Sequence, residues 1–400
     1  RVGAAVMELP SPRIAPDDPS LASGEQLLED LLDAAYWRKV CPHLHVGEAK
    51  AAAKAVDEEV ANTKREEFVA NGFFHMEQDD LGTDPEVIDA LALGVVLLMQ
   101  HGWPASFIYV YDEPWQVIET ARALVEKATG GSGFIGDLYA WYVDPKRGQR
   151  GWGPHRDRMG SGPDSFREDG TAMLSTTWLA LTDASPHNSC LYVVPRSDDP
   201  YFDKADLPDV DPLAAIFADD PQAYQSIRAL PCPRGNAWHF SHKTIHWGSH
   251  VANPSSIRSP KVPPRIAMSW VVGDKSFEEP ALIDTCMPFP PVPSRVAFIA
   301  GQQIAYGGQT GLRKGFKTLC FRIFKLRAED FSQFYRDKVE FIHFCRPAPP
   351  AAVMVKERSQ EPEENSAMIK LASELDGGEM REGLRNMFGG DSSSSEEDEE

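Results

Sequence analysis

The feature that most restricts the fold is a series of short apolar runs in the middle of the chain. They are rich in aromatic and β-branched residues, and clusters of Pro, Gly, Asn and Asp separate them. The runs are Phe134–Val143, Thr171–Leu181, Cys190–Val194, Ala237–Phe240, Thr244–Val251 and Arg265–Val272. Such a series is typical of a β-sandwich or barrel. We therefore expect a β core over about residues 134–275.

Helical patterns flank this region. Apolar residues recur at helical spacing after Gln26, and an Ala-, Glu- and Lys-rich stretch covers about 47–70. Asp84 and Pro85 are a typical start for the apolar helix that follows, and a further amphipathic helix is expected over Glu113–Ala128. The fold class that follows is mainly β with flanking helices, an α+β arrangement.

The helical and β patterns divide the chain into three parts. We expect an N-terminal helical extension over residues 1–65 and a β domain over residues 66–346, with an insertion at about 198–230. Residues 347–400 end in a Ser- and Glu-rich run and should be a disordered acidic tail. We interpret this tail first as solubilising; phosphorylation of its serines, or contact with a protein partner, is the open alternative.

Charge and composition exclude several classes of partner. The net charge is −20, and the last fifty residues hold 14 acidic and 5 basic side chains. Outside the tail the chain is still acidic, so no nucleic-acid partner is expected. No apolar stretch is long enough to span a bilayer, so no membrane partner is expected either. The six scattered cysteines form no CxxC pair and indicate a reducing, intracellular compartment, most simply the cytoplasm, with an organelle left open.

The segment Gly153–Asp157 carries the first sign of chemistry. On an extended strand, side chains two residues apart point to the same side, so His155 and Asp157 can bind one ion while Arg156 faces away. A third ligand must come from elsewhere, and Gly235–His246 offers several histidines. Two histidines and one carboxylate on one face of a metal are typical of non-haem ferrous oxygenases. A lone HxD motif, however, also occurs by chance.

Further blocks surround this motif in a fixed order. They are His155–Asp157, Trp178–Asp183, Asn188–Asp198, Gly235–Ser249 and Arg265–Ser269. In order and content, these blocks resemble the phytanoyl-CoA dioxygenase family of iron(II)/2-oxoglutarate enzymes over about residues 66–275. The resemblance implies a double-stranded β-helix core of the jelly-roll or cupin type.

The resemblance also implies the roles of individual residues. Counting from Gly235 selects His246 as the third ligand of Fe(II), with His155 and Asp157, rather than His239 or His242. Arg265 is the expected partner of the far carboxylate of 2-oxoglutarate, since a guanidinium can donate two parallel hydrogen bonds. Arg258 is the alternative to Arg265.

Weaker site candidates follow from the same blocks. Ser249 and Trp178 are expected beside 2-oxoglutarate, and Asn188 and Arg196 at the mouth of the site. Arg196 stands where the family has Gly, and this departure leaves the contacts with substrate open. No catalytic residue beyond the metal ligands is expected.

The implied function is an iron(II)/2-oxoglutarate-dependent dioxygenase. It would use O2 to hydroxylate a C–H bond of a small molecule, with release of succinate and CO2. The main alternative is a non-catalytic cupin-like protein that binds a metal or ligand. A halogenase would lack the carboxylate that Asp157 provides, and a scaffolding role through the acidic tail would predict no iron. The sequence does not select a substrate, a CoA thioester included.

Overall fold

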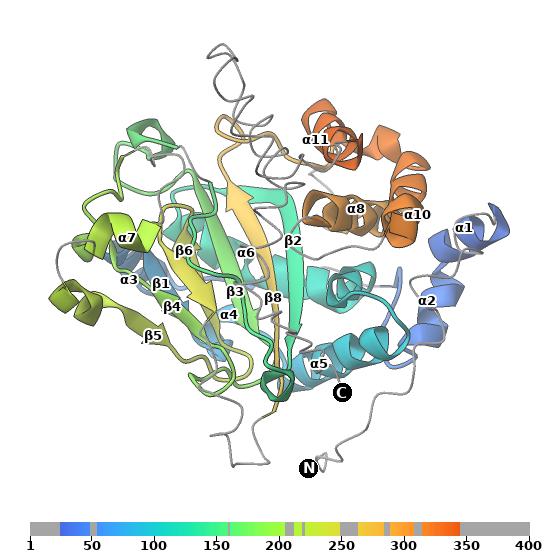
Figure 1. Ribbon diagram of the computed structural model, residues 1–400, viewed down its shortest axis with the longest axis horizontal. Helices are drawn as coiled ribbons and strands as arrows, with labels where there is room; N and C mark the ends of the chain where they lie inside the picture. The colour runs from blue at the N-terminus through green and yellow to red at the C-terminus, as the bar shows by residue number, and fades with distance from the viewer. Residues whose placement is uncertain are drawn as a thin grey trace, which may run out of the picture.

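The computed structural model describes most of the chain between residues 25 and 344 (Figure 1). The described ranges are 25–48, 54–158, 161–204, 212–217, 221–248, 263–283, 289–307 and 314–344. The predicted acidic tail, Ser249 and Arg258 lie outside these residues.

Five antiparallel strands form the larger sheet. Its order is β1 (Phe73–Met76), β6 (Ala237–Ser241), β3 (Leu174–Ala180), β8 (Arg265–Gly273) and β2 (Gly133–Val143). Neighbours in this order lie far apart in sequence: the most distant paired residues, Phe73 and Phe240, are 167 positions apart.

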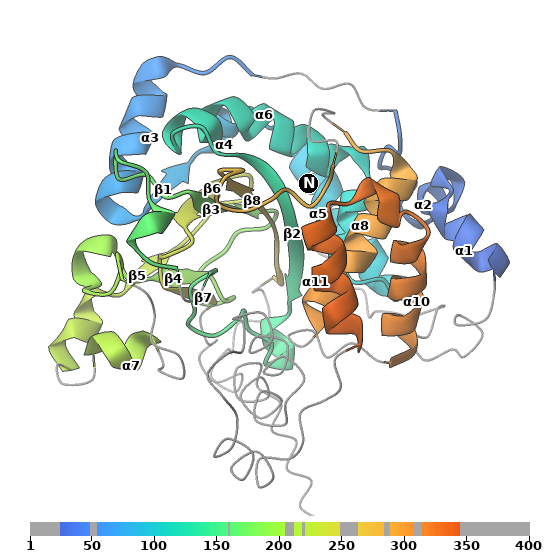
Figure 2. The same ribbon diagram turned by 90° about the horizontal axis from the view of Figure 1, so that it is seen from above.

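Three short antiparallel strands form the second sheet, in the order β5 (Arg228–Leu230), β4 (Leu191–Val193) and β7 (His246–Gly248). Trp178 and Phe240 of the larger sheet share a buried cluster with Leu191 and Val193 of the smaller one. The two sheets therefore face each other across a common core, and Figure 2 shows the smaller sheet opposite the curved larger one. This agrees with the predicted jelly-roll sandwich.

Helices cover the outer face of the larger sheet. The helices before β2 are α1 (Glu25–Leu32), α2 (Ala34–Val40), α3 (Glu58–Asn71), α4 (Gln78–Leu81), α5 (Pro85–Gln100), the 3-10 helix η2 (Ala105–Val110) and α6 (Asp112–Ala128). Helix α5 begins as predicted, because the side chain of Asp84 accepts a hydrogen bond from the amide of Glu86 and Pro85 occupies the first turn.

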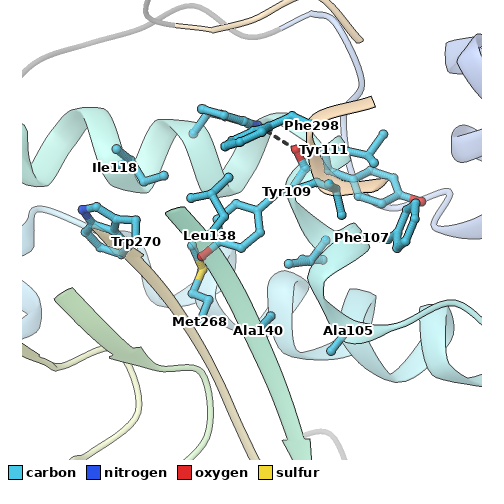
Figure 3. Close-up of a cluster of buried hydrophobic side chains, with 14 of the residues drawn as sticks. Ala105, Phe107, Tyr109, Tyr111, Ile118, Leu138, Ala140, Met268, Trp270 and Phe298 are labelled. Atoms are coloured by element: carbon cyan, nitrogen blue, oxygen red, sulfur yellow. Dashed lines mark hydrogen bonds between the residues drawn. The ribbon is translucent and has the colours of Figure 1, made fainter. Parts of the chain in front are cut away.

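The larger core cluster lies between this helical layer and the sheet. Leu138 on β2 and Trp270 on β8 point away from the smaller sheet and are buried with Tyr109 and Phe298 (Figure 3). Phe298 belongs to α8 (Val292–Ala305), which packs with α10 (Lys314–Lys325) and α11 (Gln333–Phe344).

The segment after β4 carries small helical elements. They are η5 (Arg196–Asp198), α7 (Pro212–Phe217) and η6 (Pro221–Ser226). Phe217 packs with Val194 and Ile245, so this segment covers the outer face of the smaller sheet. The domain limits at residues 65 and 346 stay a prediction, although Leu31 and Trp37 share the main core with α8.

The prediction of a mainly β chain is not confirmed. Among the described residues, helices contribute more of the chain than strands do, because the region from 292 onward is helical throughout its described elements. Strands β1 and β5 are too short to give an alternating pattern in the sequence.

No helix in the described ranges is both long and apolar enough to cross a bilayer.

Candidate metal centre

Backbone pairing brings the first and last predicted ligands together. The amide of His155 donates to the carbonyl of His246 at 3.1 Å, and the amide of His246 donates back at 3.0 Å. The amide of Asp157 donates to the carbonyl of His242 at 3.0 Å. The segment before β3 thus pairs with β7 through an isolated antiparallel bridge.

Three donor atoms converge at this point. The candidate ligand atoms of His155, Asp157 and His246 all lie within 4.8 Å of one another. Each histidine Nε2 is 3.6 Å from Oδ1 of Asp157. As the spacing predicted, the intervening Arg156 points the other way and forms a buried ion pair with Asp199 at 2.7 Å.

Both imidazole rings are oriented by backbone carbonyls. Nδ1 of His155 lies 2.7 Å from the carbonyl of Gly153, and Nδ1 of His246 lies 3.0 Å from that of Thr244. A carbonyl can only accept, so each Nδ1 carries a proton, and Nε2 is the ring nitrogen left to bind a metal. Nε2 of His155 is buried and has no hydrogen-bond partner in the part of the chain that the structure describes.

Asp157 has one oxygen occupied and one facing the histidines. Its Oδ2 accepts a hydrogen bond of 2.5 Å from the hydroxyl of Thr176 on β3. Burial alone would raise the pKa of Asp157, but His246, His155 and the Thr176 hydroxyl bring it below its ordinary value. The carboxylate is therefore ionised at neutral pH, as a metal ligand must be.

His246 is held in the neutral form. Burial, reinforced by the neighbouring His155, lowers the pKa of His246 to about 4. Two imidazole nitrogens and one carboxylate oxygen form the donor set that suits ferrous iron and leaves further coordination positions open. The residues present therefore fit such an ion.

Arg265 lies on the same face of the larger sheet as this site. It begins β8, and Ala267, two residues on, belongs to the core between the two sheets. Its side chain is 1% exposed, donates to the carbonyl of Ser189 at 2.7 Å and lies 5.5 Å from the ring of Trp178. No carboxylate among the described residues pairs with it.

Among the described residues, this guanidinium is a buried charge without a counter-ion. Burial lowers the pKa of Arg265 to about 10, so it stays protonated at neutral pH. A buried cation is costly unless an anion or a set of acceptors compensates it. Nε of Arg265 is also buried and, within the described ranges, without a partner. The arrangement can therefore accept a carboxylate from a ligand.

The other predicted site residues have structural contacts. Asn188 is buried and stabilises the turn in which it lies. Its side-chain oxygen accepts from the amide of Ser185, and its side-chain nitrogen donates to the carbonyl of Asp183. That turn places Ser189, whose positive φ of 69° directs its carbonyl to Arg265. Arg196 donates to the carbonyls of Val69 and Gly170 and pairs with Asp203, so these contacts tie loops together and give its predicted place at the site mouth no support.

The two competing histidines lie in apolar surroundings. His239 stacks on Phe74, and its Nδ1 is 2.8 Å from the hydroxyl of Thr177. His242 lies between Phe166 and Phe277. Burial lowers the pKa of His239 to about 3 and that of His242 to about 4. Neither belongs to the group of potential metal ligands found among the described residues.

Two contributors to the site were not predicted. Thr176 carries no motif of its own, and only the pairing of β3 with its neighbours brings it to Asp157. Arg158 pairs with Glu278 and Asp137, which are distant in sequence. The adjacency of Arg158 to the HxD motif was the one available signal.

The sequence matches the family described as Phytanoyl-CoA dioxygenase (PhyH) over residues 38–259, more than half of the chain, and the match ends before Arg265. No curated protein matches the chain.

Several solved structures are similar at low identity. One is the epimerase SnoN in complex with Fe3+, alpha ketoglutarate and nogalamycin RO, with 16% identity, a TM-score of 0.39, and coverage of 55% of this chain and 85% of that one. Another is AviO1 from Streptomyces viridochromogenes Tue57, with 17% identity, a TM-score of 0.37, and coverage of 56% and 97%. A third is EctD from S. alaskensis, with 15% identity, a TM-score of 0.36, and coverage of 58% and 81%.

Proposed function

Because the chain belongs to the phytanoyl-CoA dioxygenase family, we propose that it is an iron(II)/2-oxoglutarate-dependent dioxygenase. It hydroxylates a C–H bond of a small molecule with O2 and releases succinate and CO2. The observation that carries this proposal is the convergence of two bare imidazole nitrogens and one carboxylate oxygen within 4.8 Å.

The iron and its co-substrates supply the oxidising chemistry, and the protein supplies orientation. His155, Asp157 and His246 would hold Fe(II) through Nε2, Oδ1 and Nε2. The Gly153 and Thr244 carbonyls fix the two rings, so that the lone pairs meet at one point. The Thr176 hydroxyl keeps the second carboxylate oxygen engaged, which favours binding through a single oxygen.

Arg265 would bind the far carboxylate of 2-oxoglutarate. Its guanidinium is buried, positively charged and free of carboxylate partners in the described structure, and Trp178 lies beside it. A planar guanidinium can donate two parallel hydrogen bonds to such a group. A non-catalytic metal-binding barrel would have no use for this buried charge, so Arg265 favours the enzyme.

The test is succinate release by the purified full chain. Wild-type protein with Fe(II), 2-oxoglutarate and O2 should release succinate, and a metabolite mixture should increase the rate. The variant Asp157→Ala should reduce release to background, because only two neutral ligands remain. The control Asp89→Ala removes an exposed carboxylate on α5 and should behave as wild type. Wild-type succinate release by Asp157→Ala would overturn the ligand assignment.

A further inference from the structure

Four aromatic rings lie together beside the metal centre and have no part in the function proposed above. The ring of Trp152 is 5.7 Å from that of His155. Tyr139 is 5.0 Å from Trp152, and Tyr306 is 5.4 Å from it. Trp141 completes the group at 4.7 Å from Tyr139. We name these four residues the aromatic wall. All four side chains are partly exposed.

The pattern of β2 shows that the wall is not part of the main core. Leu138 and Ala140 point to the helical layer and are buried there. Tyr139 and Trp141 alternate with them and therefore face the opposite side, which is the side of the metal centre.

Small residues on the neighbouring strand leave room for these rings. Ser269 pairs with Tyr139, and Ala267 pairs with Trp141, in the register of β2 and β8. Because side chains of paired positions lie next to each other, two large rings can spread over two short side chains. The rings contact one another in tilted and edge-to-face arrangements.

The wall also carries donors for which the described residues offer no acceptor. Within the described part of the chain, the Tyr139 hydroxyl and the indole N–H groups of Trp141 and Trp152 make no hydrogen bond. Tyr306 differs, since its hydroxyl donates to Asp137 at 2.5 Å. A ligand on this surface would therefore gain by offering oxygen acceptors.

Arg158, a cation close to the hydroxyl of Tyr306 in the wall, is already neutralised. Arg158 follows the ligand Asp157 in sequence and bonds both oxygens of Glu278 at 2.7 Å. It also bonds Asp137 at 3.2 Å. The guanidinium therefore offers no charge to an anionic substrate, and the wall offers ring faces and neutral donors instead.

We propose that the aromatic wall binds the substrate, and that this substrate is an uncharged aromatic ring system carrying carbonyl, ether or hydroxyl oxygens. Offset or edge-to-face contacts with the ring faces would hold it, and its oxygens would accept from the free N–H and O–H groups. A simple acyl chain would leave these donors without partners. The inference rests on the proposed function, because it places the substrate beside the reacting metal.

The experiment measures binding without turnover. The full chain is loaded anaerobically with Fe(II) and 2-oxoglutarate, and binding of 7-methoxycoumarin is compared with that of octanoyl-CoA by ligand-observed NMR and calorimetry. We expect 7-methoxycoumarin to bind the more tightly. Trp152→Leu should raise its Kd about tenfold, the equivalent of about 1.4 kcal/mol, and the isosteric Tyr139→Phe should raise it two- to fivefold, roughly the loss of one neutral hydrogen bond.

The control uses the same strand. Tyr142→Phe makes the same chemical change as Tyr139→Phe, but on the face of β2 that packs against the main core, and should leave Kd unchanged. Tighter binding of octanoyl-CoA, or a wild-type Kd in both Trp152→Leu and Tyr139→Phe, would overturn the inference. Tyr139→Phe keeps the ring, so it remains informative if the leucine variant does not fold.

The two proposals can fail separately. If the coumarin binds through the wall but no succinate is released in air, substrate binding by the aromatic wall is supported and the dioxygenase proposal is contradicted. If succinate is released while the coumarin fails to bind, the dioxygenase proposal stands and the wall inference falls.

Discussion

At the residue scale, the site depends on which ligand atoms already form hydrogen bonds within the protein and which remain available to a metal. His155, Asp157 and His246 each have one polar atom tied to the protein and another directed at the common point. The sequence could predict the ligands, because an HxD spacing and a distal histidine are visible without a structure. It could not predict Thr176, because that contact exists only when β3 is folded beside the ligand segment.

Removal of the Thr176 hydroxyl should weaken metal binding. Thr176→Val keeps the shape of the side chain but frees Oδ2 of Asp157, so the carboxylate can rotate. Loss of such an outer partner typically costs 10–100-fold in metal affinity, and we expect a change of about tenfold in an anaerobic Fe(II) titration. The matched change Thr177→Val points to the other face of β3 and should spare the metal, while destabilising the fold through His239. Equal iron affinities of Thr176→Val and wild type would argue against this role.

Arg265→Lys should weaken the binding of 2-oxoglutarate without removing the positive charge. An ammonium cannot present two parallel donors, and it would be shorter in reach than the guanidinium. We expect the Kd for 2-oxoglutarate, measured by calorimetry, to rise at least tenfold, while Fe(II) affinity stays unchanged. A loss of iron binding in this variant would show instead that Arg265 acts on the structure of the site.

At the scale of elements, the close contact of β7 with the ligand segment is the decisive packing feature. The amide of Gly248 donates to the carbonyl of Trp152 at 2.9 Å, and a Cβ on Gly248 would lie only 2.8 Å from the amide nitrogen of Gly151. Only glycine permits this approach, because backbone atoms of Gly151 fill the space that a side chain would need.

Gly248→Ala should therefore push the ligand segment away from β7. Overpacking of this kind costs roughly 1–3 kcal/mol of stability, and the displaced His155 should lower the affinity for Fe(II). Urea unfolding and iron titration measure the two effects. Gly133→Ala is the control, because a Cβ there would meet nothing within 4 Å. If the Gly248 variant matches that control in both measurements, the contact has no role in the site.

Element boundaries show what sequence patterns could and could not predict. The start of α5 and both ends of α6 were predicted within one residue, because capping and apolar spacing are local signals. The strands β1 and β5 were missed, since they are three or four residues long and depend on pairing with distant partners. The share of helix was underestimated although the region after residue 292 carries a helical signal. In α10 the buried residues Phe316, Leu319 and Ile323 recur at helical spacing.

At the scale of the whole molecule, buried histidines make stability depend on pH. The pKa of His239 is about 3 in the folded chain, because of burial, against an ordinary value of 6.5. Between these values the unfolded chain binds the extra proton and the folded chain does not. Stability therefore falls as pH decreases below about 6.5, by up to about 1.4 kcal/mol per pH unit for one such group.

His239→Phe should reduce this pH dependence. The free energy of unfolding of the metal-free chain, measured in urea at pH 7 and pH 5, should differ less in the variant than in wild type. Phenylalanine suits the apolar position beside Phe74 but leaves Thr177 without its partner, so the difference between the two pH values is the relevant quantity. His187→Phe changes an exposed histidine and should keep the wild-type difference. An unchanged difference in His239→Phe would assign the acid sensitivity elsewhere.

The reciprocal backbone bonds between residues 155 and 246 have a consequence for how the ion enters and leaves. Because main-chain hydrogen bonds already hold these two ligands side by side, no hinge or lid movement is needed to bring them together. The empty and loaded proteins should then share one backbone shape, and uptake of the ion should cost little reorganisation. Release of the ion would require either rotation of an imidazole ring or breakage of the backbone hydrogen bonds between the segment of residue 155 and β7. The lifetime of the metal-bound state should therefore follow the rate at which these hydrogen bonds open.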